Sequence, residues 1–278
     1  MLKQFQNKFS QIFYSRIKYI LPKNKNSSSI LVNSFPKSGT HLLYQLFWES
    51  DYTNDFKSFI VSHPSRSKSE NLINQTNSYI DNLLNGELIR GHIFYDKSTA
   101  ELIKNKNIIN YFIYRDPRDV VISEANYLYN MNKFHILHKH YKKITNNDDR
   151  IKFSIMGNDF LDTGFTYKNI NDRFLDYKGW LSDINCFSVR YEDLINFNKN
   201  KTISNILNFY IKSSKSKQSL SQILNKSIES INPSKSHTFS TGGTAKWKKI
   251  FNDEHKELFK KYAGDLLIEL KYEENYDW

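Results

Sequence analysis

A short polar loop between two apolar segments constrains the fold of this chain more than any other feature. Ser34-Phe35-Pro36-Lys37-Ser38-Gly39-Thr40 follows the apolar run Ile30-Leu31-Val32 and leads into the apolar-rich segment Leu42–Phe47. This order predicts a strand, a tight loop and an amphipathic helix. Backbone amides and the positive end of the helix dipole attract anions at such a helix start. Gly39 lets the backbone approach a ligand, and Lys37, Ser38 and Thr40 add charge and hydroxyl donors. The loop therefore predicts a site for a phosphate-bearing ligand.

This loop differs from the one that binds ATP or GTP in many enzymes. That motif requires G-x-x-x-x-G-K-[ST], with the Lys after the second Gly and a Ser or Thr on magnesium. Here Lys37 precedes Gly39 and the first Gly is missing. We expect phosphate binding without the usual magnesium arrangement. On the loop alone, an ordinary turn with a helix cap stays an alternative.

Further apolar segments alternate with helical patterns along the chain. Strands are expected at Glu87–Ile93, Ile108–Tyr114 and Cys186–Tyr191, and helices at or after Ser98, Asp116-Pro117, Thr202–Tyr210 and Asp253–Leu270. Ser98-Thr99-Ala100-Glu101 predicts a capping box, and Asp253 is expected to cap the last helix. Residues 51–78 and 142–182 are expected to hold helices and loops. The alternation predicts an α/β fold with three layers, in which helices cover both faces of a central parallel sheet. The first strand, loop and helix would form a P-loop-like unit.

The length of 278 residues fits one main domain. We assign residues 28–278 to that domain and residues 1–27 to a basic amphipathic segment with a polar linker. Residues 1–21 could lie on a membrane or pack on the domain, and packing is favoured. They lack the continuous apolar core of a secretory signal. No apolar run is long enough to span a membrane.

Charge and cysteine content narrow the setting. Lys plus Arg number 40 against 29 Asp plus Glu, which gives a net charge of +11. Such an excess favours a polyanionic partner without naming one. Cys186 is the one cysteine, so no intrachain disulfide can form, and a reducing, cytoplasmic location fits. We interpret Cys186 as a small core residue and not as a nucleophile.

A second polar cluster follows the strand that ends at Tyr114. It reads Arg115-Asp116-Pro117-Arg118-Asp119-Val120-Val121-Ile122-Ser123. Ligands of open α/β sheets bind at the carboxyl ends of strands. There the fork of Arg115 and the hydroxyl of Ser123, about two turns into the helix, suit a second phosphate. Arg118 and Asp119 are expected only to cap and brace the helix.

The two clusters in this order resemble the PAPS-dependent sulfotransferase family, as a bacterial-type member similar to its cytosolic domain. PAPS is 3′-phosphoadenosine 5′-phosphosulfate. Two more segments are similar to that family: Arg190-Tyr191-Glu192-Asp193-Leu194, and the stretch from Thr238 to Lys248. The resemblance covers roughly residues 28 to 272.

The resemblance implies roles for matching residues. Lys37, Ser38, Gly39, Thr40 and His41 would bind the 5′-phosphosulfate. The 3′-phosphate would be bound by Arg115, Ser123 and a C-terminal loop with Ser240, Thr241 and Gly242, while Tyr191 would lie near the adenine. The function implied is transfer of a sulfonate group to an acceptor hydroxyl or amine. The acceptor would be a small molecule, lipid or glycan, and neither a metal nor a nucleic-acid partner is expected.

His92 is the candidate general base. Arg90-Gly91-His92 resembles the setting in which many relatives carry a histidine after a strand. An acceptor hydroxyl must lose a proton as it attacks sulfur, and a neutral imidazole is suited to take it. Without the family context, a histidine packed at a strand end is the better reading. Lys37 would stabilise charge on the departing phosphate.

Three positions depart from the family pattern. Ser240-Thr241-Gly242 stands where relatives have Arg-Lys-Gly, so an expected phosphate-binding Arg is missing, and Lys235, Lys246 or Lys248 are the candidates to replace it. Leu42 stands where many relatives have a Trp that stacks on adenine, and Lys246 replaces an acidic residue. These departures point away from the animal phenol and steroid enzymes.

Several alternatives stay open at this stage. One is an atypical P-loop kinase or hydrolase, and another is a degenerate sulfotransferase fold that binds polyanions. His135, His138 and His140 could hint at a metal, but a polar helix face is the better interpretation, because no cysteine or well-placed carboxylate completes a site. The apolar residues of segment 142–182 could form an acceptor wall or pack in the core.

Overall fold

The computed structural model describes residues 28–48, 54–62, 71–160, 165–196, 198–214, 219–230 and 243–278. The chain divides into two compact units. Unit 1 comprises residues 1–114 and 179–239, and unit 2 comprises residues 115–178 and 240–278. The predicted N-terminal segment 1–27 lies outside the described residues. The single domain assigned to residues 28–278 stays a prediction.

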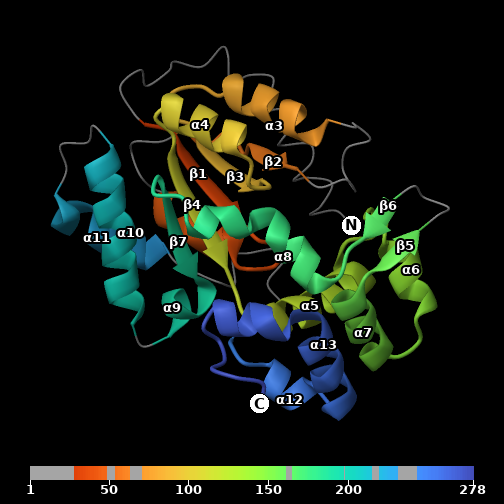
Figure 1. The fold of residues 1–278 in the computed structure, drawn as a ribbon. Coiled ribbons are helices and arrows are strands. Elements are labelled where there is room, and N and C mark those ends of the chain that lie inside the picture. The colour runs from red at the N-terminus through yellow and green to blue at the C-terminus, as the bar shows by residue number, and fades with distance from the viewer. Residues whose placement is uncertain are drawn as a thin grey trace. The chain divides into compact units, whose positions relative to one another are not determined.

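Unit 1 is built on a five-stranded parallel sheet (Figure 1). Its strands lie in the order β2-β3-β1-β4-β7. They are β1 (Ile30–Ser34), β2 (Phe59–Val61), β3 (Leu88–His92), β4 (Ile109–Tyr114) and β7 (Cys186–Arg190). All four neighbouring pairs are parallel, as the near-continuous apolar runs predict. From β1 the chain first builds the β3–β2 side and then the β4–β7 side. The loop after β1 therefore leaves the sheet at a topological switch point, where open α/β sheets bind ligands.

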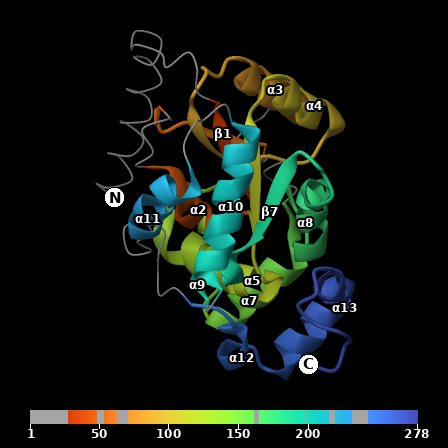
Figure 2. The same ribbon diagram turned by 90° about the vertical axis from the view of Figure 1, so that its left-hand side faces the viewer.

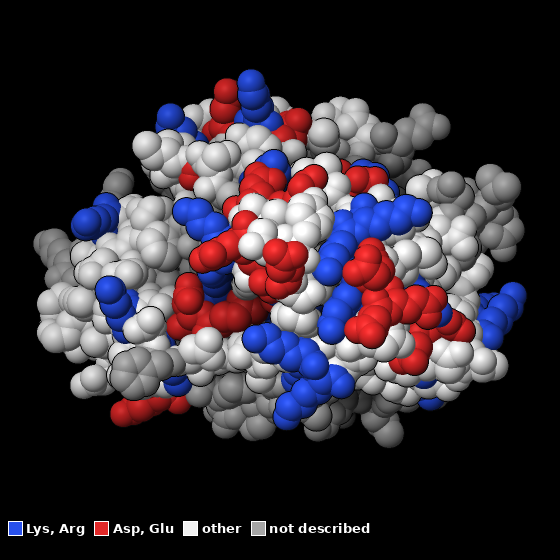
Figure 3. Space-filling view, turned by 60° about the horizontal axis from the view of Figure 1, so that its bottom comes forward, with Lys and Arg blue, Asp and Glu red and all other residues white. Residues whose placement is uncertain are grey.

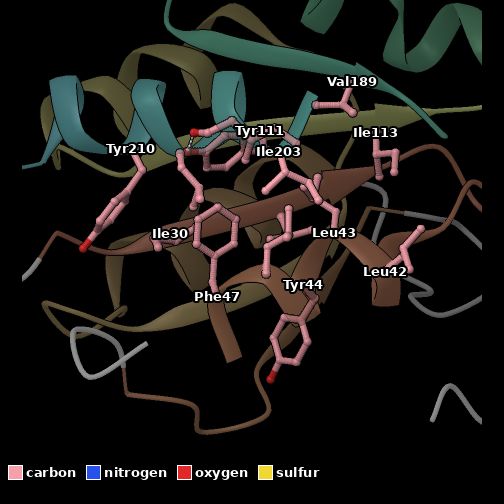
Figure 4. Packing of buried hydrophobic residues seen from close by; sticks show 14 of the residues in the cluster. Ile30, Leu42, Leu43, Tyr44, Phe47, Tyr111, Ile113, Val189, Ile203 and Tyr210 are labelled. Atoms are coloured by element: carbon pink, nitrogen blue, oxygen red, sulfur yellow. Dashed lines mark hydrogen bonds between the residues drawn. The ribbon is translucent and has the colours of Figure 1, made fainter. Parts of the chain in front are cut away.

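Three helices cover one face of this sheet: α2 (Thr40–Trp48), α10 (Lys199–Ser213) and α11 (Leu220–Ser230) (Figure 2). Alternate strand residues, among them Ile30, Tyr111 and Val189, point into the resulting core (Figure 4). The hydroxyl of Tyr111 donates to the carbonyl of Ile206 at 2.9 Å, so this buried polar atom is satisfied. Each fully buried side chain of this size contributes about 1.5–3 kcal/mol.

Two helices, α3 (Leu72–Asp81) and α4 (Lys97–Asn105), lie on the opposite face of the sheet. Because crossovers between parallel strands are right-handed, helices that connect strands in opposite directions lie on opposite faces. Unit 1 also contains the short η2 (Gly179–Leu181) and α9 (Tyr191–Ile195). The three-layer α/β architecture expected from the sequence is thereby confirmed.

Unit 2 is mainly helical. Its elements are α5 (Pro117–Asn126), the π-helical turn η1 (Tyr127–Met131), α6 (His138–Lys143), α7 (Asn147–Met156), β5 (Asn158–Phe160), β6 (Phe165–Tyr167), α8 (Ile170–Lys178), α12 (Trp247–Ile250) and α13 (Asp253–Glu269). The predicted start of α5 is confirmed: Asp116 accepts from the amide of Arg118, and Pro117 takes the first helical position.

Four local predictions were wrong. Segment 51–78 contains β2, and segment 142–182 contains the antiparallel pair β5–β6. Strands of three residues are too short to show a period of two. The cap of α4 is Asp96 and not Ser98, because its carboxylate accepts from the amides of both Ser98 and Thr99. Asn252, and not Asp253, caps α13, in a reciprocal capping box with His255. Among the described residues, no helix has the length and apolar character to cross a membrane.

Candidate active site

The loop between β1 and α2 has the backbone form of an anion site. Lys37 and Gly39 both take left-handed conformations, with φ of +66° and +94°. The amide of Ser38 donates to the carbonyl of Phe35 at 3.2 Å, which closes the turn. The amide of Phe35 donates to the carbonyl of Ile113 on β4 at 3.1 Å, which ties the turn to the sheet. Left-handed residues within a turn direct backbone N–H groups toward a common point, and a non-glycine residue in this region is a strained position.

Ser38 provides the test of whether an oxyanion fits here. Its side chain is fully buried, and within the part of the chain that the structure describes its hydroxyl has no hydrogen-bond partner. A buried hydroxyl without a partner is unfavourable by about 1–3 kcal/mol. Such exceptions require an explanation. A phosphate or sulfonate oxygen at this loop would supply the missing acceptor, so the loop fits an oxyanion.

Tyr191 lies against the same loop. A Cβ atom placed on Gly39 would come within 2.5 Å of Cδ2 of Tyr191, so only glycine leaves room for this ring. Tyr191 begins α9 directly after β7 and is largely buried. The structure therefore brings together the loop and Tyr191, the aromatic residue for which the family resemblance implies a place near the adenine.

His92, at the end of β3, is joined to the loop through Ser34. Its Nδ1 lies 2.9 Å from the hydroxyl of Ser34 and 3.1 Å from the Ser34 carbonyl oxygen. The Ser34 hydroxyl lies 2.6 Å from that of Thr40, the first residue of α2. A carbonyl oxygen only accepts, so its contact favours the tautomer with the proton on Nδ1. The lone pair of the neutral ring is then on Nε2.

The sequence did not identify Ser34 as a functional residue. Its link to His92 depends on the parallel register of β1 and β3, in which Asn33 pairs with Gly91. The ring of Phe59 on β2 packs edge-on against His92, with 5.0 Å between ring centroids. The imidazole is thus positioned by three neighbouring strands. The hydrogen bonds from Asn33 to the main chain of Ile93, one with the side chain as donor at 3.1 Å and one with it as acceptor at 2.8 Å, fix the chain immediately after His92.

In unit 2, Arg115 is the centre of a separate polar group. Its guanidinium donates to the carboxylate of Asp119 at 2.9 Å and to the carbonyl of Gly243 at 2.9 Å. The second oxygen of Asp119 accepts from the amide of Trp247 at 3.1 Å. Asp119 therefore does more than brace α5: it holds Arg115 and the segment around Trp247 together. Ser123 follows Asp119 by four residues, which puts both on one face of α5.

Arg118 is buried in a different set of contacts. Its guanidinium carbon lies 3.6 Å from the ring centroid of Trp247 and 4.5 Å from that of Trp278. It also forms ion pairs with Asp116 and Glu273. These contacts support the prediction that Arg118 is structural.

Comparison with known protein families decides the classification. Residues 27–271 match the model of the sulfotransferase domain family.

The chain belongs to the sulfotransferase domain family.

Solved structures with this fold are distant in sequence. The mouse sulfotransferase SULT7A1, complexed with PAP, is 17% identical with a TM-score of 0.55, and 88% of each chain is covered. Two structures of retinol dehydratase are 16% identical and cover 91% of this chain and 85% of theirs. One holds androsterone and inactive cofactor PAP, at a TM-score of 0.56, and the other holds retinol and PAP, at 0.55. At these identities the likeness establishes the fold. A search of curated protein sequences returned no match.

The sequence of this sulfotransferase domain also indicated C-terminal loop residues and a group of histidines as candidates. Ser240, Thr241 and Gly242 lie outside the described residues, so their predicted roles stay predictions. His135 and His138 bind main-chain groups of Leu137 and Leu128 through Nδ1. Within the described ranges, no three His, Cys, Asp or Glu side chains are grouped as metal ligands.

Among the apolar candidates of segment 142–182 whose side chains the structure describes, two pack against each other. Phe153 stacks on Tyr167, with 5.7 Å between centroids, whereas Met156 is exposed. This packing favours the core interpretation for Phe153 and Tyr167. Cys186 lies in β7 and is partly exposed, and desolvation raises the pKa of its thiol. A thiol with a raised pKa is a poor nucleophile, which agrees with the second part of the sequence interpretation. The partial exposure of Cys186 does not fit the prediction that it is a core residue.

Proposed function

We propose that this sulfotransferase domain moves a sulfonate group from PAPS to a hydroxyl or amine of a small acceptor and releases adenosine 3′,5′-bisphosphate. The observation that carries the proposal is the buried hydroxyl of Ser38, which has no hydrogen-bond partner among the described residues. It lies in a left-handed loop that is linked to His92 by the hydrogen bonds of Thr40 and Ser34. The PAP found in the similar structures supports the choice of donor. Androsterone and retinol in two of them support a small-molecule acceptor, although lipids and glycans stay within the proposal.

Distinct residues would hold each part of the donor. Lys37, Ser38, Gly39, Thr40 and His41 would bind the 5′-phosphosulfate. Arg115 and Ser123, together with Ser240, Thr241 and Gly242, would bind the 3′-phosphate, and Tyr191 would lie near the adenine. When bound, PAPS supplies a sulfonate group activated by its phosphate leaving group.

The protein would contribute position, charge and a proton acceptor. Lys37 would stabilise the negative charge that develops on the leaving phosphate. His92 would take the acceptor's proton on Nε2, while Ser34 holds Nδ1 and so keeps the ring in the useful tautomer. Holding both reactants in an in-line arrangement would supply most of the remaining rate enhancement. A sulfonate carries less charge than a phosphoryl group, and we expect the transfer to need no metal.

The competing proposal is that the fold only binds polyanions. The net charge of +11 favours it. On the face shown in Figure 3, however, acidic and basic side chains are interspersed and do not form one basic surface. A broad field of one sign is what non-specific polyanion binding requires.

Calorimetric titration with adenosine 3′,5′-bisphosphate, compared with ATP plus magnesium, tests the donor. We expect selective binding of the bisphosphate and its loss in Arg115→Ala. Turnover of labelled PAPS against an acceptor panel then tests the chemistry: Lys37→Ala and His92→Ala should abolish transfer, and the exposed control Lys104→Ala should not. If the protein does not bind the bisphosphate but binds nucleic acid with a steep salt dependence, the polyanion-binding proposal replaces this one.

A further inference from the structure

Lys246 lies in a segment that is attached at two points to the Arg115–Asp119 pair. On one side of it, the carbonyl of Gly243 accepts from Arg115 at 2.9 Å. On the other side, the amide of Trp247 donates to Asp119 at 3.1 Å. Arg115 and Asp119 are themselves paired at 2.9 Å. The backbone on either side of Lys246 is therefore anchored to one buried ion pair.

The shape of this segment directs the Lys246 side chain back toward Gly243. Gly243 and Ala245 both have left-handed conformations, with φ of +86° and +54°. A Cβ atom placed on Gly243 would lie 3.7 Å from Cε of Lys246. The far end of this lysine thus folds over the residue whose carbonyl binds Arg115. Left-handed backbone at a residue other than glycine, as at Ala245, is strain of the kind that accumulates at ligand sites.

Lys246 is close enough to Arg115 and Asp119 for both to influence its pKa. Asp119 is the carboxylate that pairs with Arg115. One of its oxygens binds Arg115 and the other binds the Trp247 amide. The pKa of Lys246 is lowered, first by burial and then by Arg115, and Asp119 opposes this shift. Bringing two like charges together is unfavourable unless an anion joins them.

We propose that Lys246 binds the 3′-phosphate of the nucleotide together with Arg115. This inference rests on the proposed function, because it takes Arg115 as a 3′-phosphate residue. Lys246 would then supply positive charge that the family expects from an Arg at the position of Ser240. An ammonium group offers three donors on a flexible stem and suits a phosphate as a point charge. The substitution of an acidic residue by Lys246 is thereby explained as a compensating change.

The test compares two nucleotides that differ only in the 3′-phosphate. Adenosine 3′,5′-bisphosphate and AMP are titrated calorimetrically into the wild-type protein, Lys246→Met, Lys246→Arg and the exposed neighbour control Lys249→Met. We expect the wild-type protein to prefer the bisphosphate. Lys246→Met should weaken bisphosphate binding by about tenfold, as for loss of one charge-assisted contact, and leave AMP binding unchanged. Lys246→Arg and Lys249→Met should retain the preference.

The outcomes separate this inference from the function on which it rests. If the wild-type protein prefers the bisphosphate and Lys246→Met keeps the same preference, Lys246 is not a 3′-phosphate residue and the proposed function stands. If Lys246→Met weakens the binding of both nucleotides equally, the lysine acts through the structure of the segment, and the inference is also wrong. A wild-type protein with no preference for the bisphosphate overturns both proposals. Thermal unfolding of each variant shows whether it is folded.

Discussion

The hydroxyl of Ser34 lies 2.9 Å from Nδ1 of His92, and 58 residues of sequence separate the two. The same hydroxyl lies 2.6 Å from that of Thr40 at the start of α2. One small side chain therefore connects the candidate base with the candidate phosphate loop. If His92 acts as the base, Ser34 is a positioning residue, because it acts through the imidazole.

Replacing Ser34 with Ala tests this role. Loss of a hydrogen bond worth about 1–2 kcal/mol in the transition state should lower kcat about fivefold to thirtyfold. The KM for PAPS should change less, because the loop keeps its own backbone bonds. Ser34→Thr retains a hydroxyl and should preserve most of kcat. A Ser34→Ala protein with unchanged kcat, measured by initial rates with labelled PAPS, would remove Ser34 from the mechanism.

Gly39 is the second position where the structure makes a sharp prediction. Alanine at Gly39 would place its Cβ 2.5 Å from Tyr191 and would be strained at a φ of +94°. We expect Gly39→Ala to destabilise the protein by about 1–3 kcal/mol and to weaken binding of adenosine 3′,5′-bisphosphate. Urea unfolding and calorimetry measure the two effects. Adding Tyr191→Leu should recover part of the lost stability, since it removes the clashing ring; no recovery would contradict the steric explanation.

The sequence was sufficient where structure is set by neighbouring residues. The loop at Lys37–Thr40 and the helix start at Asp116-Pro117 were both located, because their signals lie within a few residues of each other. It was insufficient where contacts join distant segments. The link from Ser34 to His92 requires the register of β1 and β3. The link from Trp247 to Asp119 spans 128 residues and requires the fold of unit 2.

The cap of α4 shows a smaller limit of sequence reasoning. Ser98 and Asp96 are both good N-cap residues, and the pattern from Ser98 to Glu101 favoured the first. In the structure the Asp96 carboxylate accepts from two amides and from the Ser98 hydroxyl. An ionised carboxylate is a stronger hydrogen-bond acceptor than a hydroxyl, so Asp96 and not Ser98 caps the helix.

The pH dependence of the free energy of unfolding should reveal the contribution of the Asp96 cap. The hydrogen bond from Ser98 is the main cause that lowers the pKa of Asp96. A carboxyl whose pKa is lower in the folded state stabilises the protein above its unfolded-state pKa, and this contribution is lost as pH falls through the folded-state value. Asp96→Ala should therefore lower the free energy of unfolding by about 1 kcal/mol at neutral pH and by less in acid. Asp96→Asn keeps a cap without a titrating group. A difference between wild type and Asp96→Ala that is constant in urea unfolding from neutral to acidic pH would contradict this explanation.

The burial of Arg118 leads to the largest predicted loss of stability. Its guanidinium is almost fully buried, pairs with Asp116 and Glu273, and lies over the ring of Trp247. Arg118→Met would remove the guanidinium that neutralises the buried Asp116 carboxylate and would leave it only uncharged donors such as the amide of residue 118. We therefore expect a loss of about 3–5 kcal/mol at pH 7, measured by urea unfolding. Burial raises the pKa of Asp116, and Arg118 opposes that shift.

In the variant the Asp116 pKa should therefore rise further. Protonation of Asp116 at lower pH removes the charge that has lost its guanidinium partner, so the difference in stability from wild type should narrow as pH falls. Arg118→Lys keeps the positive charge but lacks the planar fork, and it should lose less stability than Arg118→Met. If Arg118→Met and Arg118→Lys lower the free energy of unfolding equally at every pH, then packing against Trp247, and not the ion pair with Asp116, holds Arg118 in place.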